Sequence, residues 1–322
     1  MPIKLLDRLS RTSLGSIALL ISLPILFELA AILVAERSWF VEVGYLQVFQ
    51  VRLAMQAGLA LLGFGLGAVL LGGNLAIARR CVAPTEGMLP GRLPFRRLLL
   101  ATIALSVAIA GLVVFYGQTA LQAWHSRPAV ALPITLSGLG IAIVVVLLLL
   151  GQPALWAIAL LISLACGLVL SDQWQTVLLG FHRSAFDRTD PLFGRDLGDY
   201  IFQLPLWELI TFWLVGLLAI ALASVLLVYL RSNNSISQGE FLGFASAQRR
   251  HLSAIGGALM LTVSLNDWLD RYRLLYAPGN ASYGASYVDV NIQLPVETGL
   301  CLLALAIALF CCVGHWLGRA SP

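Results

Sequence analysis

Four residues in one polar segment, residues 174–205, have side chains that could do chemistry: His182, Asp187, Asp190 and Asp196. Carboxylates at this spacing could hold a hard cation such as calcium, and an aspartate with His182 could act as an acid–base pair. No calcium-loop pattern accompanies them, and ion pairs between these aspartates and the neighbouring arginines would fold the segment equally well. Both interpretations stay open, but we favour the structural one and assign neither a catalytic residue nor a metal site.

A second polar segment, residues 269–296, contains Asp270, Arg271 and Asp289. On a helix, Asp267 and Arg271 have the i,i+4 spacing at which side chains meet on one face, so an ion pair between them is geometrically natural. We expect an ordered cap, with Asp270, Arg271 and Asp289 as its candidate functional residues.

Glu28 is an acidic residue inside a long apolar stretch and follows Pro24. A charge at the centre of a bilayer costs about 2.5–3.5 kcal/mol on insertion scales, and such residues usually face a cavity or the interior of a bundle. Two other interpretations stay open. Glu28 could be protonated, because burial raises the pKa of a carboxyl group, or it could lie close enough to the membrane surface to be hydrated.

The amino-acid composition indicates whether the elements that carry these residues lie in water or in lipid. Of the 322 residues, 59% are hydrophobic and 11% are charged, whereas soluble domains contain about 25% charged residues. The excess of apolar residues must therefore face lipid. No basic run with interleaved aromatic residues suggests nucleic acid. The five cysteines show no C-x-x-C spacing, so no cofactor is predicted.

A spanning helix needs about 20 mostly apolar residues, and the chain contains roughly eight stretches near that length. They predict an all-α fold, a polytopic transmembrane helical bundle in which residues 1–322 form a single transmembrane domain. Two long ordered extracytoplasmic loops, 172–205 and 269–296, complete it. The fourth and fifth stretches form a tight hairpin that either spans fully or is re-entrant. The spans are expected near 14–35, 53–78, 98–117, 133–150, 154–171, 206–230, 252–268 and 297–317.

The distribution of charge predicts the orientation. Arginine and lysine concentrate in the termini and in the short segments after the second and sixth stretches, while most acidic residues lie in the longer loops. Basic residues beside spans favour the cytoplasmic side. We therefore expect a multi-pass protein of the bacterial inner (plasma) membrane, with cytoplasmic N and C termini.

Four stretches resemble a UPF-type family of uncharacterised multi-span bacterial membrane proteins known from cyanobacteria and actinobacteria. They are residues 39–49, 182–205, 249–253 and 268–295. The resemblance covers nearly the whole chain, and the hairpin at 133–171 is most similar to the cyanobacterial branch. Family members typically continue into one further span and a large extracytoplasmic domain. The resemblance therefore implies a short member, a split product or a fragment.

The same resemblance ranks the aspartates. Asp190, Asp196, Asp270 and Asp289 match the family pattern, whereas Asp187 stands where relatives more often carry an uncharged residue. This difference argues against an inherited metal site at Asp187.

Three functions follow as hypotheses. The first is a non-enzymatic anchor, docking or scaffold component whose extracytoplasmic face binds a protein partner in the lipid bilayer. The alternative is a transporter or channel with Glu28 in an intramembrane cavity. The third is an outer-surface enzyme acting on lipid or an envelope precursor, with Asp190 or Asp270 as the acid or base and His182 as its partner.

Overall fold

The computed structural model describes residues 20–82, 93–124, 132–231, 240–241, 244–276 and 284–320, apart from 21, 25 and 29. The side chains of 93–98, 120–124, 132–137, 240–241 and 314–320 lie outside the description. The chain divides into two compact units, Met1–Ala57 and Gly58–Pro322.

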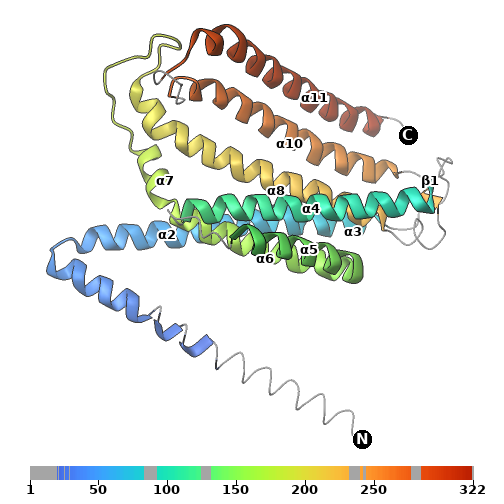
Figure 1. Cartoon of the computed structure of the whole chain (residues 1–322), viewed down its shortest axis with the longest axis horizontal. Helices are drawn as coiled ribbons and strands as arrows, with labels where there is room; N and C mark the ends of the chain where they lie inside the picture. Colours follow the sequence, from blue (N-terminus) through green and yellow to red (C-terminus); the bar gives the residue numbers. More distant parts are fainter. Residues whose placement is uncertain are drawn as a thin grey trace, which may run out of the picture. The chain divides into compact units, whose positions relative to one another are not determined.

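In the first unit, a helix that ends at residue 42 is followed by a turn at Gly44, whose φ is +80°. Helix α2 (Leu46–Gly67) begins directly after this turn (Figure 1). An ion pair between Arg52 and Glu36 ties the two helices together. The Arg52 Cζ atom also lies 5.5 Å from the ring centroid of Phe40. The turn is therefore closed by a charge pair and a cation–π contact.

The second unit is almost entirely helical (Figure 1). One pair of two-residue strands, β1 and β2, is antiparallel. The elements are η1 (Ala68–Gly73), α3 (Asn74–Arg80), β1 (Leu93–Pro94), α4 (Phe95–Trp124), α5 (Leu132–Leu150), α6 (Gln152–Asp172), α7 (Trp174–Phe181), η2 (Asp199–Gln203), α8 (Leu204–Leu230), β2 (Glu240–Phe241), α10 (Ser246–Arg273), η3 (Asp289–Gln293) and α11 (Leu294–Ala320).

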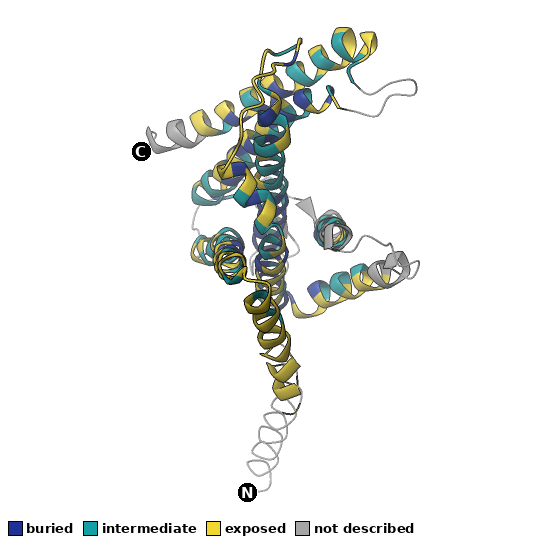
Figure 2. Ribbon diagram, turned by 90° about the vertical axis from the view of Figure 1, so that its left-hand side faces the viewer, coloured by how far each residue is buried: buried dark blue, intermediate teal, exposed yellow. Residues whose placement is uncertain are grey.

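Helix α8 is the centre of the core. It packs against α3, α4 and α10, and its residues Leu217, Val225, Leu227 and Tyr229 are almost completely buried. Figure 2 shows the exposed residues, in yellow, on the outward faces of the helices. Because α8 is hydrophobic on every side, it can only be stable when surrounded by other helices or by lipid.

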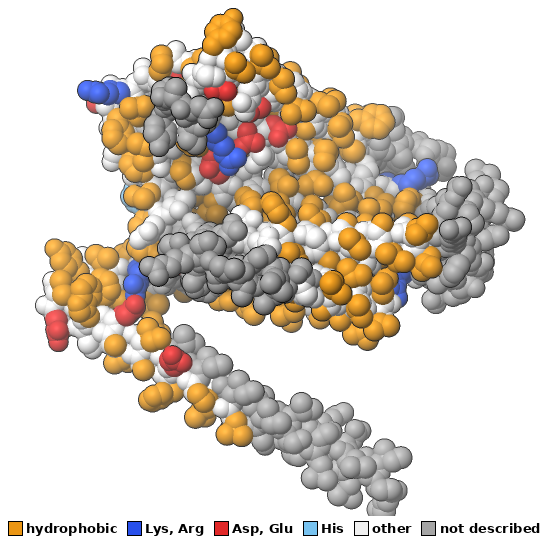
Figure 3. Space-filling view, viewed as in Figure 1, with side chains coloured by type: hydrophobic (Ala, Val, Ile, Leu, Met, Phe, Trp, Pro, Cys, Tyr) orange, Lys and Arg blue, Asp and Glu red, His pale blue; other side chains and the backbone are white. Residues whose placement is uncertain are grey.

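Six helical segments are long and apolar enough to cross a membrane: Leu46–Arg80, Leu99–Thr119, Gln152–Asp172, Asp199–Leu230, Ser246–Arg273 and Asp289–Val313. Figure 3 shows hydrophobic side chains over much of the visible face. Six of the eight predicted spans fall on these segments. The described apolar part of the fourth, Gly138–Leu150, is shorter. The first, 14–35, lies partly outside the described residues, so the number eight stays a prediction.

The turn between α5 and α6 depends on Gly151, whose φ of +65° favours glycine. An Arg231 guanidinium nitrogen would lie 3.1 Å from a Cβ added there. The Nη1 atom of Arg231 donates to the carbonyl oxygens of Leu147 and Leu148. The Leu147 carbonyl also accepts from the Gly151 N–H, so Arg231 adds a second donor at the end of α5, where carbonyl groups run short of helical partners.

Two of the long helices begin in the same way, with the pattern D-x-x-x-Q-L-P at 199–205 and at 289–295. In each, the aspartate-to-glutamine stretch is a π-helix, and the leucine N–H donates to the aspartate carbonyl five residues earlier. A proline has no N–H to donate, and its ring clashes with the carbonyl four residues before it. The clash widens the preceding turn, which explains why the same π geometry occurs twice.

Candidate functional site

The loop between α7 and η2, residues 182–198, is folded around the carboxylate of Asp190. This side chain is 7% exposed. It accepts hydrogen bonds from the N–H groups of Leu192 (2.8 Å), Phe193 (2.6 Å) and Arg195 (2.8 Å) and from the Tyr200 hydroxyl (2.7 Å). We call residues 182–198 the Asp190 loop.

The electrostatics of Asp190 follow from these bonds. Burial by itself would raise its pKa, but the donors on Phe193, Tyr200, Arg195 and Leu192 outweigh it and hold the pKa below the ordinary value. A carboxylate held by several N–H donors is stabilised in its charged form. Asp190 is therefore a structural anion rather than a proton donor near neutral pH.

A second carboxylate, Asp196, closes the other side of the loop. It accepts hydrogen bonds from the N–H groups of Phe186 (3.1 Å) and Gly198 (2.7 Å), and these bonds lower its pKa. Between these two partners lies Asp187, whose φ of +54° is uncommon for a residue with a side chain. The backbone of the loop is thus fixed by side-chain carboxylates together with an antiparallel bridge between Thr189 and Asp196.

Aromatic and cationic side chains hold the Asp190 loop against the end of α10. The rings of Phe193 and Tyr272 lie 4.9 Å apart, edge to face. The Arg195 Cζ atom lies 4.6 Å from the Tyr272 ring centroid. Arg271 reaches the loop from α10, with its Cζ atom 4.1 Å from the ring of Trp268 and 5.8 Å from that of Phe193. These stacked contacts keep the loop in one position.

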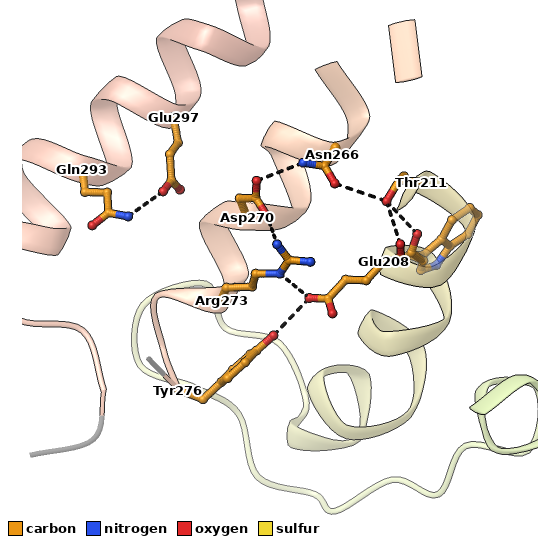
Figure 4. A network of polar contacts seen from close by, with 9 residues as sticks. Glu208, Thr211, Asn266, Asp270, Arg273, Tyr276, Gln293 and Glu297 are labelled. Carbon is orange, nitrogen blue, oxygen red and sulfur yellow. Dashed lines mark hydrogen bonds and ion pairs between the residues drawn. The ribbon is translucent and has the colours of Figure 1, made fainter. Parts of the chain in front are cut away.

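Next to the loop, a network of polar side chains joins α8 to α10 (Figure 4). Arg273 donates from Nε to Glu208 (2.7 Å) and from Nη1 to Asp270 (2.5 Å). Asp270 in turn accepts from the Asn266 amide (3.0 Å), and the Tyr276 hydroxyl donates to Glu208 (3.1 Å). Burial and the carboxylate of Glu208 raise the pKa of Tyr276 to about 12. The hydroxyl is therefore neutral and donating at physiological pH.

The predicted site residues do not converge on one centre. Asp190 and Asp196 both belong to the Asp190 loop, while Asp270 and Arg271 lie on α10, Arg271 reaching the loop. His182 is exposed, and its Nδ1 atom lies 3.0 Å from the Leu178 carbonyl oxygen of its own helix. Among the described residues, no hydrogen bond joins His182 to an aspartate. The ring therefore does not pair with Asp190, as an acid–base site would require.

Three further predictions are placed as follows. Asp289 accepts a hydrogen bond from the Ser286 N–H (2.7 Å), the role of a helix-capping side chain. Glu28 is exposed in the first unit, so the cavity predicted beside it stays a prediction. No ion pair joins Asp267 and Arg271 in the described part of the chain. Within that part, no group of three or more His, Cys, Asp or Glu side chains could hold a metal ion.

Sequence reasoning missed two groups of polar contacts. Glu208 is in none of the candidate sites proposed from the sequence, yet this residue accepts from both Arg273 and Tyr276. His251 is likewise in none of those sites, yet its ring lies between Tyr229 Oη (2.7 Å) and Asn74 Oδ1 (3.0 Å). These partners are distant in sequence, so no spacing could have found them.

Comparisons with known proteins identify a family for this chain. The profile of an uncharacterised protein family, UPF0182, matches residues 13–322. A UPF0182 protein of Nostoc sp. (strain PCC 7120) is 38% identical over 90% of this chain and 34% of its own length. A UPF0182 protein of Synechocystis sp. (strain PCC 6803) is 33% identical over 95% of this chain and 34% of its own. No solved structure matches the chain.

The chain therefore spans about a third of the length of these relatives. The match extends over nearly all of this chain and includes the Asp190 loop, the two D-x-x-x-Q-L-P helix starts and the network at the end of α10. On this ground the chain belongs to the UPF0182 family, an uncharacterised protein family.

Proposed function

We propose that this chain is an integral protein of the bacterial plasma membrane, with cytoplasmic termini, and that its Asp190 loop is a docking surface for an extracytoplasmic protein segment. The observation that carries the proposal is the internal order of the loop together with its exposed apolar side chains. The carboxylates of Asp190 and Asp196 accept from backbone N–H groups of the loop, while Phe186 and Leu197 are exposed among polar side chains.

Phe186 of the loop is 47% exposed, and Phe181, the last residue of α7, is 75% exposed. Ile201, on the following π-helix, is exposed as well. An exposed apolar group on a rigid loop costs little conformational entropy to bind, because the loop is already ordered. Contiguous apolar patches on ordered loops mark sites that bind a protein or a membrane.

The length of the relatives supports a protein segment as the occupant. Two thirds of the length of those relatives lies outside the match. The partner we propose is a protein segment of that kind, supplied by the same polypeptide or by another one. Insertion of the loop into headgroups is the competing outcome.

A photocrosslinking experiment in native membranes separates the two. A photoreactive phenylalanine analogue replaces Phe186 in one variant and Phe310, an exposed residue of the apolar helix α11, in the control. We expect a protein adduct from position 186 and only lipid adducts from position 310. Lipid adducts alone at position 186 would refute the docking surface.

The orientation needs its own test, because docking requires the loop to be extracytoplasmic. Ser184, an exposed residue of the loop, is replaced by cysteine after the partly or fully exposed Cys81, Cys311 and Cys312 are changed to serine. A membrane-impermeant maleimide should label this cysteine in intact spheroplasts. Labelling only after the membrane is broken would place the loop in the cytoplasm and reject the proposal.

A further inference from the structure

A cavity of about 320 Å³ lies where α4, α6, α7 and α8 meet the end of α10. Five polar side chains line it, together with apolar ones at its floor. The polar residues are Thr119, Gln173, Thr176, Glu208 and Arg273, and the floor includes Leu209, Phe212 and Trp213. We call it the head cavity. Figure 4 shows how Glu208 and Arg273 point toward each other.

Arg273, the cationic side chain in the lining of the head cavity, is already paired within the protein. Arg273 donates to the carboxylates of Glu208 and Asp270, at 2.7 and 2.5 Å. An anionic group placed here would meet two carboxylates and only one guanidinium. A polar group without net charge would instead find donors and acceptors of both kinds, including the amide of Gln173 and the hydroxyl of Thr176.

A second cavity, of about 260 Å³, adjoins the first and is lined almost wholly by apolar side chains of α4, α5, α6 and α8. Its walls include Val113, Leu139, Leu161, Ala165 and Ile220. We call it the tail groove. Only hydrocarbon suits such a lining, because a polar group there would lose its hydrogen bonds with water without replacement.

Trp213 lines both cavities, so the two adjoin at this side chain. Its ring is 8% exposed and packs edge to face on Phe212, with centroids 5.7 Å apart. The polar groups lie at the end of the helices and the apolar groove runs along them. This order of polar and apolar surface is the order within a lipid molecule.

We propose that the head cavity and the tail groove form one site for a lipid whose polar head carries no net charge. The head lies between Glu208 and Arg273, and one hydrocarbon chain lies along the groove past Trp213. A zwitterionic phospholipid and an uncharged glycolipid both have this chemistry. The inference goes beyond the docking function, because it concerns a different face of the α8 helix and a different ligand.

The test uses the full chain, purified in mild detergent and titrated with three lipids. They are a zwitterionic phosphatidylcholine, an uncharged glycosyl diacylglycerol and an anionic phosphatidylglycerol. Native mass spectrometry measures the bound fraction. We expect saturable one-site binding of at least one of the first two, about tenfold tighter than binding of the anionic lipid. Whichever of these two lipids binds more tightly identifies the polar group that the head cavity accepts. Equal or stronger binding of the anionic lipid would overturn the assignment of the head.

Two matched pairs of variants locate the site. Ala165→Phe fills the tail groove, whereas Ala306→Phe adds the same ring to an exposed position of α11. We expect the first to weaken neutral-lipid binding by about tenfold or more and the second to leave it unchanged. Equal binding by both variants would mean that the lipid only surrounds the protein, and the groove would be rejected.

The second pair changes one carboxylate at a time. Glu208→Gln removes a negative charge from the head cavity, whereas Glu297→Gln removes one from α11, where Glu297 accepts from Gln293. We expect the first to shift selectivity toward the anionic lipid by several-fold and the second to have no effect. This pair leaves the groove intact and keeps the proposal testable even if Ala165→Phe fails to fold. An unchanged selectivity of Glu208→Gln would place the head elsewhere.

Discussion

Helices α8 and α11 begin with the same seven-residue pattern and have almost the same mean hydropathy, 2.5 and 2.4 in their most apolar stretches. Their surroundings nevertheless differ. In α8, 67% of that stretch is buried inside the protein, whereas in α11 only 17% is. Helix α8 packs on α3, α4 and α10, while α11 packs mainly on α10.

The contrast separates the cause of the π-helix at the start of each helix from the cause of the helix's burial. The pattern D-x-x-x-Q-L-P acts locally, because the proline removes a donor and widens the preceding turn whatever surrounds the helix. Burial depends on which helices are neighbours, and apolar composition alone does not distinguish a helix among helices from one that faces lipid. The same substitution at matched positions should therefore have different effects in α8 and α11.

The largest difference is expected at the leucine of the pattern. Leu204 is buried with Leu269 and Tyr272, whereas Leu294 is only partly buried. Leu204→Ala should cost about 2–5 kcal/mol because it leaves a cavity in a packed cluster. Leu294→Ala should cost about 1 kcal/mol or less. Thermal unfolding in detergent compares the two, and equal shifts in Tm would show that the two leucines have equivalent environments.

The aspartates near the two helix starts should differ next. Asp190→Ala leaves three N–H groups and one hydroxyl without their acceptor, a loss on the order of 3 kcal/mol confined to the loop. Asp289→Ala removes the bond to one N–H group. Limited trypsin digestion should therefore cleave after Arg188 far faster in the first variant. Similar cleavage rates in both variants would mean that Asp190 does not order its loop.

Glycines provide a third pair. A Cβ on Gly216 of α8 would lie 2.4 Å from the Tyr116 ring, whereas one on Gly299 of α11 has nothing within 4 Å. Gly216→Ala should destabilise by about 1–3 kcal/mol through overpacking. Gly299→Ala should be neutral or stabilise by up to about 1 kcal/mol, since alanine favours helices. The sign of the change in Tm checks this prediction. Destabilisation by Gly299→Ala would indicate an unseen neighbour of α11.

The smallest effect is expected from a change of pH, measured as the protection of the Asp190 loop from proteolysis. The pKa of Asp190 is lower when folded, so its contribution is complete above the unfolded value of about 3.9 and is lost only as pH falls through the folded value. Protection of the loop should be constant from neutral pH to about pH 5 and should decline below about pH 4. Pepsin digestion across this acidic range measures it. Asp190→Asn should show a flatter profile, and a decline already near pH 6 would point to another group.

Much of the helical framework could be predicted from the sequence. Seven predicted spans fall within described helical segments, for instance 206–230 within α8 and 252–268 within α10. Long apolar stretches predict helices because backbone groups in an apolar surrounding must bond within their own segment. The structural role of the aspartates in the 182–198 loop could also be predicted, since aspartates readily form hydrogen bonds with nearby backbone N–H groups.

The ion-pair partners of individual charged side chains could not be predicted from the sequence. The expected pair was Asp267 with Arg271, but Arg271 lies over Trp268 and Phe193, and Arg273 forms the ion pairs. Spacing along one helix gives several acceptable pairs, and the neighbouring helix decides among them. Arg273 is paired with Glu208 because α8 brings this carboxylate to the end of α10.

The sequence by itself determined what depends on neighbours in the chain: the helical segments, their apolar length, the turns at glycine and proline, and the π-helices before Pro205 and Pro295. Only the tertiary structure decided which polar groups meet. Glu208 and Arg273 are 65 residues apart, and His251 and Asn74 are 177 apart. Such pairs form only where helix packing brings them within hydrogen-bond distance, and packing depends on the shapes of all the helices together.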